Sequence, residues 1–235
     1  MRPVRVVLAA TFLGALALGC STAPGLRPGA VAEEVAGTAG APPATDAEVG
    51  TGPEVDAGSG PTTVVDGVPM GYRPDVEGAE AAAREFVRAT ASMVTMAPEA
   101  AVAAQRVMAA AAAEEDLVAS RSSELQNIWG SVGREDLSYW YTPIASRASM
   151  SGAEEALAEV WYVGVLRSSL TPGLQTWRTA SFRLVWEDDD WRVHEESEVV
   201  GPVPTSSLSE PPTSTSAEMN SLLEGFEPAW AGAGR

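Results

Sequence analysis

Aromatic residues are absent from positions 21–66, and this gap limits where the chain can build a hydrophobic core. The same stretch holds eight Gly, six Pro and seven acidic residues against a single Arg. A segment of that composition cannot bury enough apolar surface to offset the entropy lost on ordering. We therefore expect residues 20–66 to form a disordered tether, and a folded domain to extend from 67 to 205.

A short apolar run precedes the tether. Met1–Arg5 carries two Arg, the 13-residue run Val6–Leu18 is mostly apolar, and Gly19 and Cys20 follow. This is the plan of a secretory signal peptide, and the run is too short for a membrane span, which needs about 20 residues.

The end of this run, Leu16–Cys20, resembles the lipobox of bacterial lipoproteins, although Ala17 and Leu18 stand in the reverse of that motif's usual order. The resemblance implies cleavage after residue 19 and acyl chains on Cys20. We therefore expect a signal peptide over 1–19 and an extracytoplasmic protein that is lipid-anchored to the cell membrane. An ordinary signal peptide followed by a chance cysteine is the alternative.

The charge and the rare residues exclude several classes of function. The formal net charge is −17, and all 15 basic residues are Arg. Nucleic acid is not an expected partner, because no basic patch is present to neutralise phosphates. With one Cys and one His, neither an intramolecular disulfide nor a multi-cysteine metal site can form, and we expect no metal and no cofactor. The use of Arg alone, together with Ala-rich runs, is typical of a GC-rich bacterial genome and suggests an actinobacterium.

The spacing of apolar residues changes along the predicted folded domain. Apolar residues recur at helical spacing in three stretches, 75–96, 98–113 and 114–129. Strand-like alternation or continuous apolar runs follow in four stretches, 138–150, 155–166, 175–186 and 191–195. We expect an α+β fold in which N-terminal helices pack on a curved antiparallel sheet of about four strands, with a short C-terminal helix.

Four segments, Gly67–Tyr72, Glu159–Leu166, Leu184–Val193 and Gly225–Glu227, together resemble a domain of unknown function in actinobacterial envelope proteins. The resemblance spans roughly 67–230 and contains no catalytic motif. In that family the hairpin reads Asp-Gly-Asp, whereas Asp189 replaces the Gly here. The resemblance implies a nuclear transport factor 2-like cone, which also serves periplasmic core subunits of conjugative type IV secretion machines. Members often lie beside conjugal-transfer genes.

The C-terminal region 206–235 reads as a Pro/Ser/Thr-rich tail with a helix at about 216–230. Five apolar residues recur there at helical spacing and form a candidate docking face for a partner: Met219, Leu222, Leu223, Phe226 and Trp230. The preferred interpretation is a helix that folds back onto the domain, and partner docking is the functional alternative.

Three other features have structural and functional interpretations. The acidic run Glu187–Asp190 resembles calcium ligands, but it lacks the EF-hand spacing and is interpreted as a solvated turn. His194 is interpreted as a surface residue rather than a general base. Five Trp in or beside strands are interpreted as sheet core rather than a binding platform: Trp140, Trp161, Trp177, Trp186 and Trp191.

These observations predict a non-enzymatic lipoprotein with no catalytic residues. Its partners would be the membrane, through the lipid on Cys20, and one or more unidentified envelope proteins, in an assembly for conjugation or type IV secretion. A module that binds a small ligand in the cone cavity is the first alternative. A cone-fold isomerase or dehydratase is the second, and it would need an acid or His aimed into a pocket.

Overall fold

Four long antiparallel strands organise the folded part of the chain. The computed structural model describes residues 60–134, 137–169, 173–205 and 213–229. The predicted signal peptide, Cys20 and the tether up to residue 59 lie outside these residues, as does Trp230. The described residues all fall in one compact unit, whereas the other unit, Leu13–Asp56, lies outside them. None of the described helices is long and apolar enough to cross a membrane.

A small hairpin opens the fold and corrects the predicted end of the tether. Strands β1 (Thr63–Val65) and β2 (Val68–Met70) pair antiparallel, so order begins within the stretch predicted to be disordered. The turn residues Asp66 and Gly67 have φ angles of 49° and 81°. Asp-Gly is a favoured sequence for a two-residue turn in which both residues are left-handed. The prediction of a tether up to residue 66 rests on the lack of aromatic residues, and that criterion does not detect a turn sequence such as Asp66-Gly67.

Three helices follow the hairpin, as the sequence predicts, with different ends. Helix α1 spans Val76–Met93 and is capped by Asp75, whose side chain accepts from Gly78 N at 2.8 Å. Helix α2 (Pro98–Met108) stops five residues before its predicted end at 113, because the chain turns to the sheet and Ala110 N donates to Val193 O. Helix α3 runs three residues beyond the predicted end, over Glu114–Val132, and stops at Gly133, whose φ is 72°.

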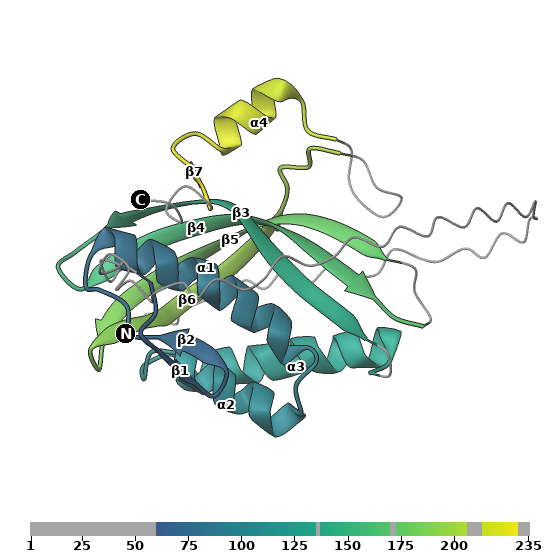
Figure 1. The fold of residues 1–235 in the computed structure, drawn as a ribbon, viewed down its shortest axis with the longest axis horizontal. Helices are drawn as coiled ribbons and strands as arrows, with labels where there is room; N and C mark the ends of the chain where they lie inside the picture. The colour runs from purple at the N-terminus through teal and green to yellow at the C-terminus, as the bar shows by residue number, and fades with distance from the viewer. Residues whose placement is uncertain (1–59, 135–136, 170–172, 206–212, 230–235) are drawn as a thin grey trace, which may run out of the picture. The chain divides into compact units, whose positions relative to one another are not determined.

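The sheet has five strands in the order β6-β5-β4-β3-β7, and all of its pairs are antiparallel. Its long strands are β3 (Ser138–Met150), β4 (Glu155–Arg167), β5 (Leu174–Glu187) and β6 (Asp190–Val200). Figure 1 shows α1 lying across one face of the sheet, with α2 and α3 on the same side. We call this the inner face, and the opposite one the outer face.

Small side chains let α1 approach the inner face closely. Ser146, Val160 and Ala180 form one row across β3, β4 and β5, and Ala158 lies in the next row. Each of these four is at most 5% exposed. The helix contributes a matching set of fully buried residues: Ala79, Ala82, Ala83 and Phe86. The Ala-rich stripe is therefore core, because small residues on both surfaces allow a short separation and dense packing.

The C-terminal region differs from the prediction in two ways. Helix α4 covers only Ser216–Leu222, rather than 216–230, and a left-handed Gly225 turns the chain away after it. The chain then returns as a two-residue strand, β7 (Glu227–Pro228), which pairs with Ala145 and Ser146 of β3. The mixed helix-and-sheet fold is confirmed, but the sheet has five strands rather than four. Two strands, β1 and β2, precede the first helix as well.

Candidate interaction surface

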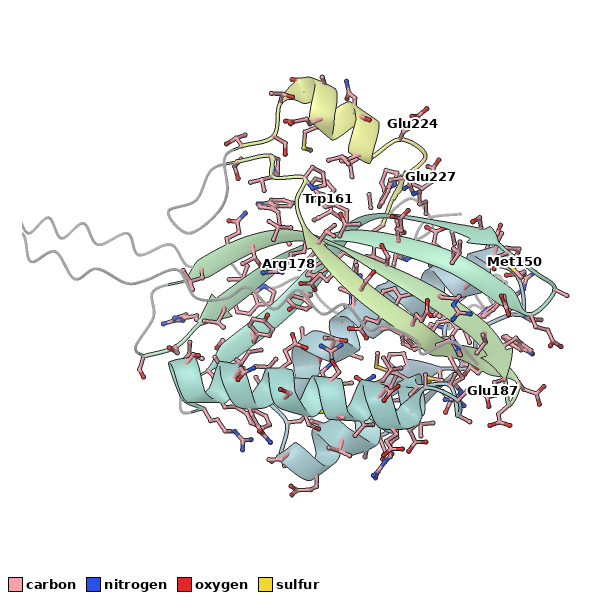
Figure 2. All side chains as sticks on the ribbon, turned by 180° about the vertical axis from the view of Figure 1, so that it is seen from behind. Met150, Trp161, Arg178, Glu187, Glu224 and Glu227 are labelled. Carbon is pink, nitrogen blue, oxygen red and sulfur yellow. The ribbon has the colours of Figure 1, made fainter. Side chains whose placement is uncertain are left out.

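A strap, residues 201–205, of which the first three are buried, crosses the outer face after β6. Gly201 N donates to Trp177 O at 2.8 Å, and Thr179 Oγ1 donates to Gly201 O at 2.8 Å. Trp161 Nε1 donates to Pro202 O at 3.0 Å, and its ring stacks on that of Trp177 at 5.0 Å. The strap therefore divides the outer face into two halves, and Trp161 lies at the division, on the side of the sheet where α4 stands (Figure 2).

The half of the outer face toward the start of β3 is aromatic and apolar. Trp140 is 46% exposed there, whereas Trp191 on the inner face is fully buried. The prediction that the Trp residues build the sheet core is therefore right for Trp191 and wrong for Trp140. The difference comes from strand alternation, because the side chain of Trp140 lies in the outward row with Val165.

Helix α4 carries two of the five predicted docking residues, Met219 and Leu222, and none of its residues is buried. Leu222 is 55% exposed, while Met219 and Leu223 are half-buried. Thr215 and Glu218 form a reciprocal capping box, so local hydrogen bonds hold the helix rather than burial in the core. The fifth predicted docking residue, Trp230, lies outside the described residues.

Arg147 joins the C-terminal segment to the sheet. Its guanidinium lies 4.6 Å from the centroid of the Phe226 ring, and Nη1 donates to Glu224 O at 2.6 Å. The same side chain forms a salt bridge with Glu159 of β4 at 2.5 Å. Arg147 is not among the residues predicted from the sequence, although it falls in the outward register of a predicted strand.

A hollow of about 720 Å³, which we call the outer groove, is lined by residues from all four long strands. Its outward side chains include two cross-strand ion pairs, Arg147–Glu159 and Arg183–Glu195. Leu157 lies in the row of Arg183 and is 49% exposed. The lining continues past the edge strand β6 to Ala112 and Ala113, in the turn between α2 and α3, and to Asp116 and Leu117 at the start of α3.

The lining of the outer groove contains more carboxylates than guanidinium groups. The lining holds four carboxylates, Asp116, Glu159, Glu195 and Glu196, against two Arg. Hydrogen bonding from Arg183 is the main cause that lowers the pKa of Glu195, so this carboxylate is charged at neutral pH. Among the described residues, no salt bridge engages Asp116. The surface therefore offers negative charge around an apolar floor.

The turn between β5 and β6 is structural. Asp190 is 5% exposed, and its carboxylate accepts from the backbone N–H groups of Gly71, Tyr72 and Trp191 at 2.5, 3.2 and 2.9 Å. The two turn residues Asp188 and Asp189 are exposed and left-handed. No group of three potential metal ligands occurs in the described part of the chain. The acidic run thus ties the N-terminal lead-in to the sheet.

His194 lies half-buried at the edge of the outer groove and belongs to its lining. Its neighbour Val193 is fully buried and meets Ala109 in a parallel bridge. The histidine therefore points away from the core, as the alternation predicts.

A buried polar network links α3 to the inner face. Arg121, which is 7% exposed, pairs with Glu124 and Glu196, and its Nε donates to Gln105 Oε1 at 3.2 Å. Burial would lower the pKa of this guanidinium, but the two carboxylates outweigh that effect and raise it. Gln105 Nε2 is buried and has no hydrogen-bond partner among the described residues. The network fixes α3 against β6.

Three tyrosines extend this polar layer. The hydroxyls of Tyr139 and Tyr141 lie 2.6 Å apart, and the ring of Tyr141 lies 4.4 Å from that of Tyr162. Burial raises the pKa of Tyr139 to about 12, and it raises the pKa values of Tyr141 and Tyr162 as well. Tyr162 donates to Glu198, which also pairs with Arg178 at 2.6 Å. These phenols are protonated at neutral pH, so Tyr162 donates to Glu198, and one hydroxyl of the Tyr139–Tyr141 pair donates to the other.

One solved structure, the crystal structure of the intermembrane space region of the chloroplast protein ARC6, matches with a TM-score of 0.36 and 15% identity. The match covers 54% of this chain and 98% of that one. No curated protein matches the chain. A family model described as Domain of unknown function (DUF8175) matches residues 17–214, a range that includes Cys20 and ends before α4. The chain belongs to this family of domains of unknown function.

Proposed function

We propose that the chain is a non-enzymatic lipoprotein, anchored by acyl chains on Cys20 to the extracytoplasmic side of the cell membrane. Its folded domain, a nuclear transport factor 2-like cone, acts as a scaffold or protein-interaction module in an actinobacterial conjugation or type IV secretion assembly. The observation that carries the proposal is the C-terminal segment. Helix α4 presents apolar residues on the outer side of the sheet and buries none of them.

The interior supports an interaction domain over a module that binds a ligand inside the cone. Side chains fill the space between α1 and the sheet, where Phe86, Tyr162 and Leu184 are each at most 1% exposed. A small-molecule site needs a concave pocket with a few convergent polar groups. The tyrosines and Glu198 are instead paired with one another and with Arg178.

The position of Cys20 supports the anchor. It is the only cysteine of the chain, and it directly follows the apolar run and Gly19. Each buried methylene contributes about 0.8 kcal/mol, so two or three acyl chains hold a protein stably where one does not. The aromatic-free stretch behind it would let the domain reach its partner away from the membrane surface.

Mass spectrometry of the mature N-terminus tests the anchor. We expect cleavage after Gly19 and an added mass of acyl chains on Cys20. We also expect Cys20→Ala to move from the membrane fraction to the soluble fraction. An unmodified cysteine, or a Cys20→Ala chain that stays with the membrane, would contradict the anchor.

Cross-linking in intact cells tests the interaction role. The exposed face of α4 is disrupted by Leu222→Ser, and the neighbouring polar substitution Asn220→Ser is the matched control. We expect a specific cross-linked envelope protein to be lost with Leu222→Ser and with a chain lacking residues 206–235, and to be retained with Asn220→Ser. Equal cross-linking in all variants, or no specific product with the wild type, would refute the role assigned to α4.

A further inference from the structure

We propose that the outer groove binds a basic, partly apolar extended segment of a partner protein. This inference rests on the proposed interaction function and adds the chemistry of the partner. Its first support is the outward sheet surface that lines the groove. Arg147, Glu159, Ser181 and Ser197 form a single outward row across β3, β4, β5 and β6, and all four line the groove.

The floor of the groove favours an apolar contact. Leu157 is 49% exposed between charged neighbours, and exposed leucine in the middle of a strand is surface that a partner side chain can cover. The turn between α2 and α3 adds Ala112 and Ala113 to the lining, beside the edge strand β6. An alternating side-chain pattern on an extended chain would place one apolar residue over Leu157 and direct its neighbours to the rim.

The rim sets the sign of the charge on the partner. Arg147 and Arg183 each pair with a lining carboxylate, and Arg121 pairs with Glu196 from the inner side. The remaining lining carboxylate, Asp116, makes the net charge of the rim negative. Outside the groove lining, the same end of the sheet carries more acids: Glu154, Glu155, Asp188 and Asp189. Complementary charge favours a partner rich in Lys or Arg, and it disfavours both an anionic membrane and a second copy of this acidic chain.

The groove is continuous with the C-terminal segment through one side chain. Arg147 lines the groove and pairs with Glu159, while its guanidinium also contacts Phe226 and the carbonyl of Glu224. Glu224 and Glu227 follow α4 on the same side of the sheet as Trp161 (Figure 2). The groove and the residues that follow α4 therefore adjoin one another at Arg147.

A labelled 12-residue peptide of alternating Lys and Leu is the probe, and the purified full-length chain in nonionic detergent is the target. We expect saturable binding by fluorescence polarisation that weakens as salt increases, since rim charges are screened. Peptides of alternating Glu and Leu, or Lys and Ser, should bind at least about fivefold more weakly, because each lacks one of the two contacts.

The decisive comparison uses two variants with equal change in net charge. Asp116→Asn with Glu195→Gln removes two carboxylates from the rim, whereas Glu77→Gln with Glu99→Gln removes two exposed carboxylates outside the groove lining. We expect the first pair to weaken binding about fivefold and the second less than twofold. Unchanged thermal midpoints would show that both variants fold.

Three outcomes would overturn this inference: no binding of the Lys–Leu peptide, equal losses in both double variants, or equal binding of the Glu–Leu peptide. Salt-sensitive self-association of the chain in sedimentation experiments would assign the surface to a second copy and would also overturn it. None of these results bears on acylation of Cys20 or on cross-linking through Leu222. The inference and the proposed function can therefore fail separately.

Discussion

The two faces of the sheet are built differently. The inner face is closed: small side chains in rows such as Ser146, Val160 and Ala180 meet the Ala-rich side of α1, and large side chains such as Trp191 fill the remaining space. The outer face is crossed by the strap, bordered by the exposed helix α4, and hollowed at the outer groove. Stability should therefore depend mainly on the inner face, and recognition on the outer face.

The comparison predicts its largest effect for two tryptophans. Trp191 is fully buried, and its Nε1 donates to Arg73 O at 2.8 Å, so Trp191→Ala should cost about 3–5 kcal/mol of unfolding free energy. Trp140 is 46% exposed, so Trp140→Ala should cost about 1 kcal/mol or less. Urea unfolding followed by circular dichroism measures both. Equal losses of unfolding free energy would show that the two faces contribute equally to stability.

Two glycines give the next largest contrast. A Cβ added at Gly164 would lie 2.7 Å from Thr176 Oγ1 and 2.8 Å from the Tyr141 ring, so Gly164→Ala should cost about 1–3 kcal/mol. Gly130, inside α3, has nothing within 4 Å of the same added atom, so Gly130→Ala should stabilise by about 0.5–1 kcal/mol. Thermal unfolding should shift in opposite directions, and a loss of stability at both positions would contradict the account.

Arg147 tests the weaker attachment on the outer face. Arg147→Gln removes the salt bridge to Glu159 and the cation over Phe226, both partly exposed, and should cost about 1 kcal/mol or less. Hydrogen exchange should accelerate in α4 and β7 and should stay unchanged in α1. Arg88→Gln, which removes the exposed salt bridge to Glu85 within α1, is the control and should leave α4 unaffected. Unchanged exchange in α4 with Arg147→Gln would show that Arg147 does not hold the segment.

The smallest predicted effect is the pH dependence of stability that Glu198 causes on the inner face. Desolvation raises the pKa of Glu198 above its ordinary value of about 4.5, although 37% of this side chain is exposed, so the folded state binds this proton more tightly than the unfolded state. The stabilising contribution is complete below pH 4.5 and is lost as the pH rises through the folded-state pKa. Glu198→Gln should remove this part of the pH dependence. The unfolding free energy of the wild type and of Glu198→Gln is measured by urea unfolding between pH 4.5 and neutrality. The same dependence on pH in both proteins would contradict the raised pKa.

The regular elements follow from periodicity, because a helix or strand repeats the same local choice over many residues. Asp75 as the cap of α1 and the alternation Ala180, Phe182, Leu184 both give their elements correctly. The predicted α+β class is confirmed for the same reason.

The remaining features of the fold depend on contacts between residues that lie far apart in the sequence. The strap is held by Trp161 Nε1 on Pro202 O, and β7 pairs with Ala145 and Ser146, more than 80 positions earlier in the sequence. A register shift between Pro143 and Ala145 also obscures the alternation in β3. Of the candidate site, the apolar character of the C-terminal helix was predictable. The outer groove was not, because it exists only once four strands align their outward rows.

The central claim is that recognition belongs to the outer face, and a residue-level NMR titration of the full-length chain with the Lys–Leu peptide tests it most directly. The account predicts shifts concentrated at the outer groove, at Arg147, Leu157, Arg183 and Glu195, with saturation at one peptide per chain. Shifts centred on α1 and the inner rows, or spread evenly over all acidic residues, would contradict it.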